Sequence, residues 1–258
     1  MARESVSKTF IVAIVLAAVC SLLVAGAAIG LRPRQEANKA LDRKINILIV
    51  ADLYDGKASV EEAFKQIETR IVDLATGKYV ARDQLDPETF DQRASARDPE
   101  LSVKIPREKD HAGIGRREKY SLVYLVKKDG KLDQVILPID GKGLWSTLYG
   151  FLALSGDLNT VRGITFYEHA ETPGLGGEVD NPRWQIKWAG KKIYGEKGSV
   201  QLHLVKGVAD KSSPEADYQV DGLSGATLTA DGVTDLVKYW LGNDGFKKLL
   251  ERLQAEGA

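Results

Sequence analysis

An uncharged run of 22 residues, Phe10 to Leu31, constrains this chain more than any other feature. A helix needs about 20 apolar residues to cross a bilayer, so the run predicts one membrane-spanning helix. A secretory signal peptide is the alternative, because Ala25-Gly26-Ala27 resembles a cleavage site. The apolar core of such a peptide is only about 7–15 residues long, so we expect an uncleaved anchor.

The flanking charges do not settle the orientation of this anchor. Basic residues lie on both sides of the run: Arg3 and Lys8 before it, Arg32, Arg34 and Lys39 after it. The larger number of basic residues after the run slightly favours a cytoplasmic domain. Long domains, however, cross membranes largely regardless of flanking charge.

Composition excludes several classes of function for the remainder of the chain. The 36 basic and 36 acidic residues cancel, so nothing predicts a nucleic-acid partner. A single cysteine, Cys20, excludes an intrachain disulfide and any multi-cysteine metal centre. The three histidines have no metal-ligand spacing, so we expect no metal site.

The order of periodic segments predicts an α+β fold with a mixed, largely antiparallel sheet and flanking helices. We expect a tail over residues 1–9, a transmembrane helix over 10–31, a polar helical stalk over 32–44 and one domain over 45–258. Expected strands are 120–126, 132–137, 161–167, 201–206 and 218–220. Trp184, Ile186 and Trp188 alternate with other residues and predict one more strand. Residues 45–53 are expected to form either a strand or a continued helix. Expected helices are 59–77, 87–96, 144–152, 227–241 and 245–253, and residues 97–118 are expected to form a surface excursion.

The stretch from Asp221 to Thr229, DGLSGATLT, joins a short expected strand to an amphipathic helix. It brings small residues, backbone N–H groups and hydroxyls to a helix N-terminus, where an anion is favoured. The alternative is an ordinary helix cap made by Thr227 or Thr229. The residues by themselves leave both readings open.

Two further loops are rich in glycine. The first is Gly141-Lys142-Gly143-Leu144-Trp145, and the second runs from His169 to Glu178 with Pro173 and three glycines. The second cannot be a regular element, and it allows a planar ligand to lie against its backbone near Thr172 and Leu175. A tight turn without a ligand is the alternative. We expect His169 to hold this loop by a hydrogen bond.

Ser224-Gly225-Ala226-Thr227, preceded by Asp221, resembles the flavinylation motif of bacterial redox membrane complexes. With the anchor, the GKGLW segment and HAETPGLGGE, the whole chain resembles the C subunits of the sodium-translocating NADH:quinone reductases. The G subunit of the Rnf-type ferredoxin:NAD complex is the alternative within the wider FMN-binding family, but the chain length and the GKGLW segment favour the C subunits.

The resemblance implies a set of cofactor residues. Thr227 would carry FMN through a phosphodiester bond. The other contacts implied are Asp221, Ser224, Gly225, Ala226, Leu144, Trp145, Glu171, Thr172, Gly174, Leu175, Gly176 and Lys206, with Lys142 as a second candidate for the phosphate.

The resemblance also implies a single-pass protein of the bacterial inner membrane, with its FMN domain on the periplasmic side. It would relay electrons towards ubiquinone in a sodium-exporting translocase, together with the membrane-embedded B, D and E subunits and the A and F subunits, and would not be catalytic alone. Threonine is a poor nucleophile and no base lies near Thr227 in the sequence, so a separate flavin transferase is expected. No dinucleotide fingerprint follows a strand, so we do not expect this chain to bind NADH.

A serine hydrolase using Ser224 with His169 is a candidate from another class. The sequence Gly222-Leu223-Ser224-Gly225 departs from the G-x-S-x-G elbow, because its second glycine comes one position early. The sequence therefore disfavours this activity.

Overall fold

The structure, a computed structural model, describes residues 5–54 and 56–257. The chain divides into two compact units, one ending at Arg43 and the other beginning at Lys44. Helix α1 (Val6–Val50) contains the uncharged run, with Pro33 inside it. It is long and apolar enough to cross a membrane, with a mean hydropathy of 2.8 in its most apolar window. The expected tail, residues 1–9, lies partly outside the described residues.

The second unit is built on a six-stranded sheet whose neighbouring strands all pair antiparallel. Its strand order is β2-β1-β5-β6-β7-β8. The strands are β1 (Ile67–Asp73), β2 (Lys78–Tyr79), β5 (Tyr120–Lys128), β6 (Lys131–Lys142), β7 (Thr147–Ser155) and β8 (Val161–Glu168). This arrangement confirms the expected α+β class.

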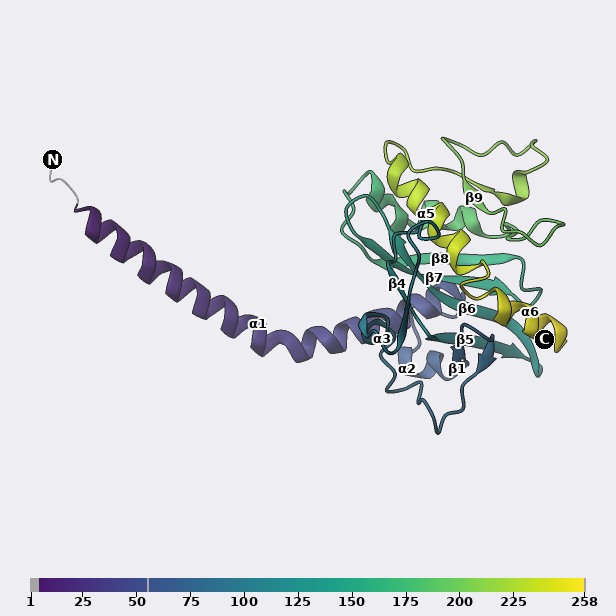
Figure 1. Cartoon of the computed structure of the whole chain (residues 1–258), viewed down its shortest axis with the longest axis horizontal. Coiled ribbons are helices and arrows are strands. Elements are labelled where there is room, and N and C mark those ends of the chain that lie inside the picture. Colours follow the sequence, from purple (N-terminus) through teal and green to yellow (C-terminus); the bar gives the residue numbers. More distant parts are fainter. Residues whose placement is uncertain (1–4, 55, 258) are drawn as a thin grey trace. The chain divides into compact units, whose positions relative to one another are not determined.

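Both faces of the sheet are buried, which explains why its central strands are almost continuously apolar. Along β5, Val123 and Leu125 face one core, whereas Leu122, Tyr124 and Val126 face the other. Successive side chains of a strand point to opposite faces, so a strand between two cores needs apolar residues at every position. The first core is closed by α5 (Thr227–Trp240) and α6 (Lys247–Ala255), which lie over the strands in Figure 1. The second is closed by the last turns of α1 and by α2 (Val60–Phe64).

The remaining elements are short. The chain from β2 to β5 contains α3 (Gln92–Arg97) and a two-stranded sheet of β3 (Ser102–Lys104) and β4 (Arg116–Glu118). After β8 come the 3₁₀ helices η1 (Gly176–Asp180) and η2 (Ile186–Trp188), with α4 (Pro182–Gln185) between them. A 3₁₀ helix η3 (Ala216–Tyr218) precedes β10 (Gln219–Val220), which pairs in parallel with β9 (His203–Leu204).

Several local predictions are confirmed. Asp129 and Gly130 form the turn of the β5–β6 hairpin, with φ angles of 53° and 79°. Two consecutive positive φ values are what an Asp-Gly hairpin turn requires. The Ser59 hydroxyl accepts a hydrogen bond from the Glu62 N–H and so caps α2, and α5 buries Val233, Leu236, Val237 and Trp240. Residues 32–44 are helical, and the segment from Ile45 continues that helix to Val50.

Two predicted helices are strands in the structure. The helix expected over 144–152 is wrong because β7 pairs with both β6 and β8 in the middle of the sheet. Leu148 and Leu152 are four apart, a spacing that places them on one face of a strand as well as of a helix. The helix expected over 59–77 ends at Phe64, and Ile67 and Ile71 lie on β1, where they pair with β5.

The opposite error concerns Trp184, Ile186 and Trp188, which alternate in sequence as a strand would. The Asn181 side chain accepts a hydrogen bond from the Arg183 N–H, and Pro182 starts a helix. Trp184 and Trp188, one helical turn apart, are buried in the first core, whereas Ile186 is 73% exposed. The tryptophans therefore follow a helical period of four.

The segment between β2 and β5 also differs from expectation. The helix expected from Pro87 to Ala96 begins only after Asp91, whose carboxylate caps it at Ala94. Residues 97–118 are not merely a surface excursion, because β4 buries Arg117 and Glu118. The strand expected over 201–206 is reduced to the two residues of β9, and α6 begins at Lys247, two residues later than expected.

Candidate functional site

Thr227 is the first residue of α5, and it is exposed to solvent. The preceding residue, Ala226, is buried, and no side chain caps the helix. The first amides of a helix have no partner within the helix and carry its positive end. The alternative that Thr227 or Thr229 caps α5 is therefore wrong, and the helix start remains able to bind an anion.

Two glycines allow α5 to pack directly against the end of β6. A Cβ on Gly232 would lie 2.2 Å from the Lys142 carbonyl oxygen, and a Cβ on Gly141 would lie 2.5 Å from the Leu236 Cβ. The Trp240 Nε1 also donates to the Asp140 carbonyl oxygen at 2.7 Å. These contacts fix the position of α5 relative to the GKGLW segment.

The Glu171 side chain joins three segments that are far apart in the sequence. Its Oε1 accepts hydrogen bonds from the N–H groups of Trp145 (2.9 Å) and Ser146 (3.0 Å) and from the Ser146 hydroxyl (3.2 Å). Its Oε2 accepts from the Leu144 N–H (3.2 Å) and from the Thr229 hydroxyl (2.7 Å). Glu171 is only 5% exposed, so one buried carboxylate connects the GKGLW segment, its own loop and α5.

These donors determine the charge state of Glu171. Burial alone would raise the pKa of this carboxyl, but the hydrogen bonds from Thr229 and from the amides of Trp145, Ser146 and Leu144 outweigh it. The pKa of Glu171 therefore lies below its ordinary value, since hydrogen bonds to a carboxylate favour the charged form. The group is an anion at neutral pH.

The loop from His169 to Glu178 is shaped by its own backbone. The Thr172 carbonyl oxygen accepts from the N–H groups of Leu175 (3.1 Å) and Gly177 (2.9 Å), and Gly174 has a φ of 74°. Leu175 lies beside the Ser224–Thr227 segment, because a Cβ on Gly225 would be 2.9 Å from the Leu175 Cδ2 atom. Gly176 lies against Glu171 and Thr229, where a Cβ would be 2.8 Å and 2.6 Å from their oxygens.

His169 holds this loop as expected. Its Nδ1 accepts a hydrogen bond from the Glu171 N–H at 3.2 Å, and its Nε2 lies 3.3 Å from an Asp180 carboxylate oxygen. Both ring nitrogens thus have partners other than Ser224. The geometry gives no support to a hydrolase that uses these two residues.

Asp221 fixes the start of the motif and does not reach towards Thr227. Its carboxylate accepts from the Lys187 ammonium (2.7 Å) and the Ala209 N–H (2.8 Å), and its carbonyl oxygen accepts from the Trp184 Nε1 (2.9 Å). Burial opposes ionisation, but the bonds from Lys187 and Ala209 lower the pKa of Asp221 below its ordinary value. Lys187 and Trp184 are partners that sequence reasoning missed.

The two candidate phosphate-binding lysines lie in neighbouring loops. The Lys142 ammonium is 3.4 Å from the Trp145 carbonyl oxygen. Lys206 is exposed in the loop after β9, and this loop contacts the motif through the Gly222 N–H, which donates to the Gly207 carbonyl oxygen at 2.8 Å.

Most predicted site residues come together in three adjoining segments, Gly143–Ser146, Glu171–Gly176 and Gly222–Thr229. Large apolar side chains on these segments remain exposed: Leu144, Trp145 (67%), Leu175 and Leu228. Sequence reasoning did not include Leu228, Ser146 or Thr229 among the expected site residues, although it considered Thr229 as a helix cap. The only available signal for them was their position beside the predicted motifs.

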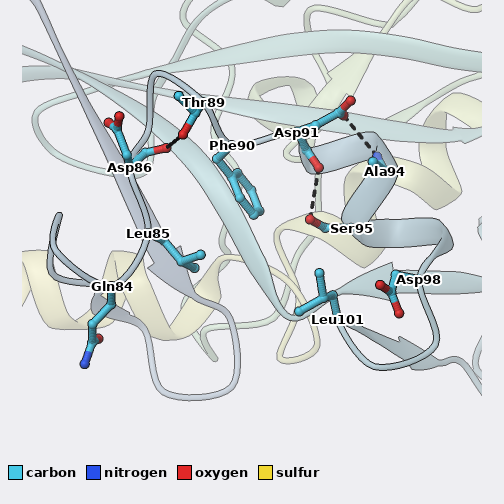
Figure 2. Close-up of a pocket in the computed structure, with 10 residues that line it drawn as sticks. All are labelled: Gln84, Leu85, Asp86, Thr89, Phe90, Asp91, Ala94, Ser95, Asp98 and Leu101. Atoms are coloured by element: carbon cyan, nitrogen blue, oxygen red, sulfur yellow. Dashed lines mark hydrogen bonds between the residues drawn. The ribbon is translucent and has the colours of Figure 1, made fainter.

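No group of three or more potential ligands that could hold a metal ion occurs among residues 5–54 and 56–257. A separate hollow of about 380 Å³ is lined by residues between Gln84 and Leu101 (Figure 2). Its three aspartates, Asp86, Asp91 and Asp98, each accept a hydrogen bond from a nearby backbone N–H. Their negative charges would repel a phosphate, so this hollow is not a candidate FMN site.

The class of protein follows from a comparison with known families. Residues 143–242 match the family described as FMN-binding domain, and this range contains the three segments around Thr227. The domain is therefore an FMN-binding domain attached to a helix that is long and apolar enough to cross a membrane.

Relatives that match over nearly the whole chain identify a particular family within this class of protein. The chain is 50% identical over 256 residues to the C subunit of the Na(+)-translocating NADH-quinone reductase of Pseudomonas aeruginosa, covering 98% of this chain and 97% of that one. It is 46% identical to the protein of the same name in Neisseria meningitidis, over 99% of this chain and 97% of that one. The crystal structure of Shewanella oneidensis NqrC superposes with a TM-score of 0.78 at 36% identity, covering 85% of this chain and 99% of that one.

This chain belongs to the family of C subunits of the Na(+)-translocating NADH-quinone reductases, which are components of an oxidoreductase complex. The resemblance to this family, rather than to the G subunits of the Rnf complexes, is confirmed.

Proposed function

We propose that this chain is an electron-carrying subunit in which FMN is attached to the Thr227 hydroxyl through a phosphodiester bond. The observation that carries the proposal is an exposed threonine, Thr227, at the first residue of an uncapped 14-residue helix inside the FMN-binding domain. FMN would supply the chemistry, accepting electrons and passing them on. The protein would supply position, charge and exclusion of water.

The residues present fit an FMN phosphate and ring. The free amides at the start of α5 suit a phosphate, and Lys142 and Lys206 lie in adjoining loops. Gly225, with a φ of 69°, lets the chain turn sharply beside Leu175. The exposed side chains of Leu144, Trp145 and Leu175 offer an apolar surface for a planar ring.

The structure also gives a reason for choosing Thr227 over its neighbours. Thr229 is 1% exposed, and its hydroxyl is used by Glu171. Ser224 is exposed but lies before the helix starts, where the free amides are not yet aligned. Of the three hydroxyl residues in SGATLT, only Thr227 is both accessible and at the helix N-terminus.

Mass spectrometry of the Thr227 peptide from native membranes tests the attachment. The peptide should gain the mass of FMN less water, and Thr227→Ala should lose all flavin under denaturing conditions. Thr89→Ala, an exposed threonine in the hollow of Figure 2, is the matched control and should keep its flavin. A Thr227→Ala protein that retains covalent flavin sinks the assignment.

The wider role follows from family membership. We infer that residues 10–31 anchor the chain in the bacterial inner membrane, that residues 32–44 form a stalk and that residues 45–258 form the FMN domain on the periplasmic side. Partners would be the A, B, D, E and F subunits of the complex, and a separate flavin transferase would attach FMN. Electrons would pass towards ubiquinone through the membrane-embedded B subunit, and sodium export would belong to the whole complex.

The orientation has its own test. A cysteine placed at exposed Lys197, in a chain whose Cys20 is replaced by serine, reports the side on which the domain lies. A membrane-impermeant maleimide added to intact spheroplasts should label it. Labelling only after lysis would place the domain in the cytoplasm.

A further inference from the structure

We propose that Glu171 is a positioning residue that does not itself contact FMN: through Thr229, Leu144 and Trp145 it fixes the two loops that enclose the flavin on Thr227. This inference rests on the proposed attachment to Thr227. It changes the expected role of Glu171 from a cofactor contact to a buried connection between the walls of the site.

The first support is the number and direction of its hydrogen bonds. Both carboxylate oxygens are fully engaged, Oε1 by three donors and Oε2 by two. A carboxylate has about four lone-pair sites, so five donors leave little capacity for a ligand. With only 5% of the residue exposed, Glu171 faces protein on nearly every side.

The second support is the close packing of the backbone against the Glu171 carboxylate. A Cβ on Gly143 would lie 2.7 Å from one carboxylate oxygen of Glu171, and a Cβ on Gly176 would lie 2.8 Å from the other. Gly143 on the neighbouring loop and Gly176 on the loop of Glu171 itself therefore allow the backbone to close around this one group. Residues with side chains at these two positions would push the loops away from the carboxylate.

The third support is the identity of the segments that are joined. Thr229 lies two residues after Thr227 on α5, and its hydroxyl donates to Glu171 at 2.7 Å. Leu144 and Trp145 donate their backbone amides to the same carboxylate while their side chains stay exposed. Leu175, four residues after Glu171, lies beside Gly225. Leu144, Trp145 and Leu175, the apolar residues that could flank a flavin on Thr227, are thus held within a few residues of Glu171 or its hydrogen-bond partners.

Three variants of the full-length protein separate positioning from attachment. Glu171→Gln keeps the shape of the side chain, but its NH₂ group faces at least one donor that loses its acceptor. Thr229→Val keeps the shape and removes the hydroxyl, whereas Thr229→Ser restores a hydroxyl. Leu253→Ala on α6, in the first core, is the control for general loss of stability.

The measurement is quenching of flavin fluorescence by iodide, expressed per covalently bound flavin. We expect the Stern–Volmer constant to rise about threefold or more in Glu171→Gln and Thr229→Val. It should stay at the wild-type value in Thr229→Ser and Leu253→Ala, because these variants keep the connection. If Glu171→Gln does not fold, the Thr229 pair decides the outcome.

Two results would overturn the proposal: equal quenching in wild type and Thr229→Val, or an equal rise in Leu253→Ala. Failure of the proposed function looks different, because the wild-type Thr227 peptide would then carry no FMN. Covalent FMN on Thr227 together with unchanged quenching would reject the positioning role alone.

Discussion

Two acidic sites in this domain have carboxyl pKa values that are shifted in opposite directions. Glu171 has five hydrogen-bond donors, and its pKa is lowered. At Asp140, directly before the GKGLW segment, burial and the nearby Glu118 carboxylate raise the pKa to about 7, against an opposing effect of Arg93. Burial likewise raises the pKa of Glu118 to about 6, although its own backbone N–H, Ser121 and Gln92 donate to it and Arg117 lies nearby.

The two sites differ in the supply of hydrogen-bond donors and in how strongly burial disfavours the charged carboxylate, although their solvent exposure is similar. Glu171 and Glu118 are buried to a similar extent, at 5% and 3% exposure. The Glu171 site presents backbone amides, which are aimed by the fold and cannot move away. At Glu118, burial outweighs the hydrogen bonds that favour the charged form, and the Glu118 carboxylate in turn raises the pKa of Asp140. The Glu171 carboxylate therefore stays charged because its donors, three backbone N–H groups and two hydroxyls, outweigh its desolvation.

Removing the Glu171 carboxylate, which has the larger number of hydrogen-bond donors, should lower the stability of the domain most. Glu171→Ala leaves buried amides and hydroxyls without an acceptor, and each such group costs about 1–3 kcal/mol. We expect the free energy of unfolding at pH 7 to fall by roughly 4 kcal/mol, measured by urea denaturation. Glu215→Ala, an exposed loop residue, should change it little. A loss below about 1 kcal/mol would contradict the view of Glu171 as a structural connection.

The contact between α5 and the end of β6 should be the next most sensitive to substitution, measured as loss of stability. Gly232→Ala gains intrinsic helix propensity of about 1 kcal/mol, but its Cβ would lie 2.2 Å from the Lys142 carbonyl oxygen. Overpacking of this kind costs about 1–3 kcal/mol, so thermal unfolding should occur several degrees lower. Ala230→Gly, in the same helix, is the matched change in the opposite sense. Unchanged or raised stability in Gly232→Ala would show that α5 can move away from the sheet.

The smallest effect on the free energy of unfolding should come from a change in the pair formed by Asp140 and Glu118. A carboxyl whose folded pKa is raised destabilises the fold as pH rises from its unfolded pKa through its folded pKa. The stability cost of ionising Asp140 should therefore build up from about pH 4 to pH 7 and persist above pH 7, and Asp140→Asn should remove that cost. Because Asp140 is only partly buried, we expect a gain of about 1–2 kcal/mol at pH 8 and none at pH 4. Denaturation at the two pH values measures it, and an equal gain at both would refute the role of ionisation.

Glu171 should show the opposite pH dependence. Its lowered pKa contributes stability above the unfolded value, and this contribution is lost as pH falls through the folded pKa. The difference in unfolding free energy between wild type and Glu171→Gln should therefore shrink in acid. A difference that grows on acidification would break the contrast between the two sites.

What the sequence alone determined was local. The uncharged run, the Asp-Gly hairpin turn, the apolar face of α5 and the glycine-rich loops are set by composition, period or backbone conformation within a few residues. The resemblance of SGAT, GKGLW and HAETPGLGGE then led to the family, which the relatives confirm. None of these signals depends on contacts between distant segments.

Tertiary structure decided the elements whose local pattern was ambiguous. Leu148 and Leu152 fit a helix or a strand, and only pairing with β6 and β8 makes them a strand. Trp184 and Trp188 fit either period, and the Asn181 cap with burial in the first core makes them helical. Glu171 is the clearest case, because its donors lie 25–27 residues before it and 58 after it. No local pattern encodes a carboxylate whose partners meet only when the sheet, the loop and α5 have packed together.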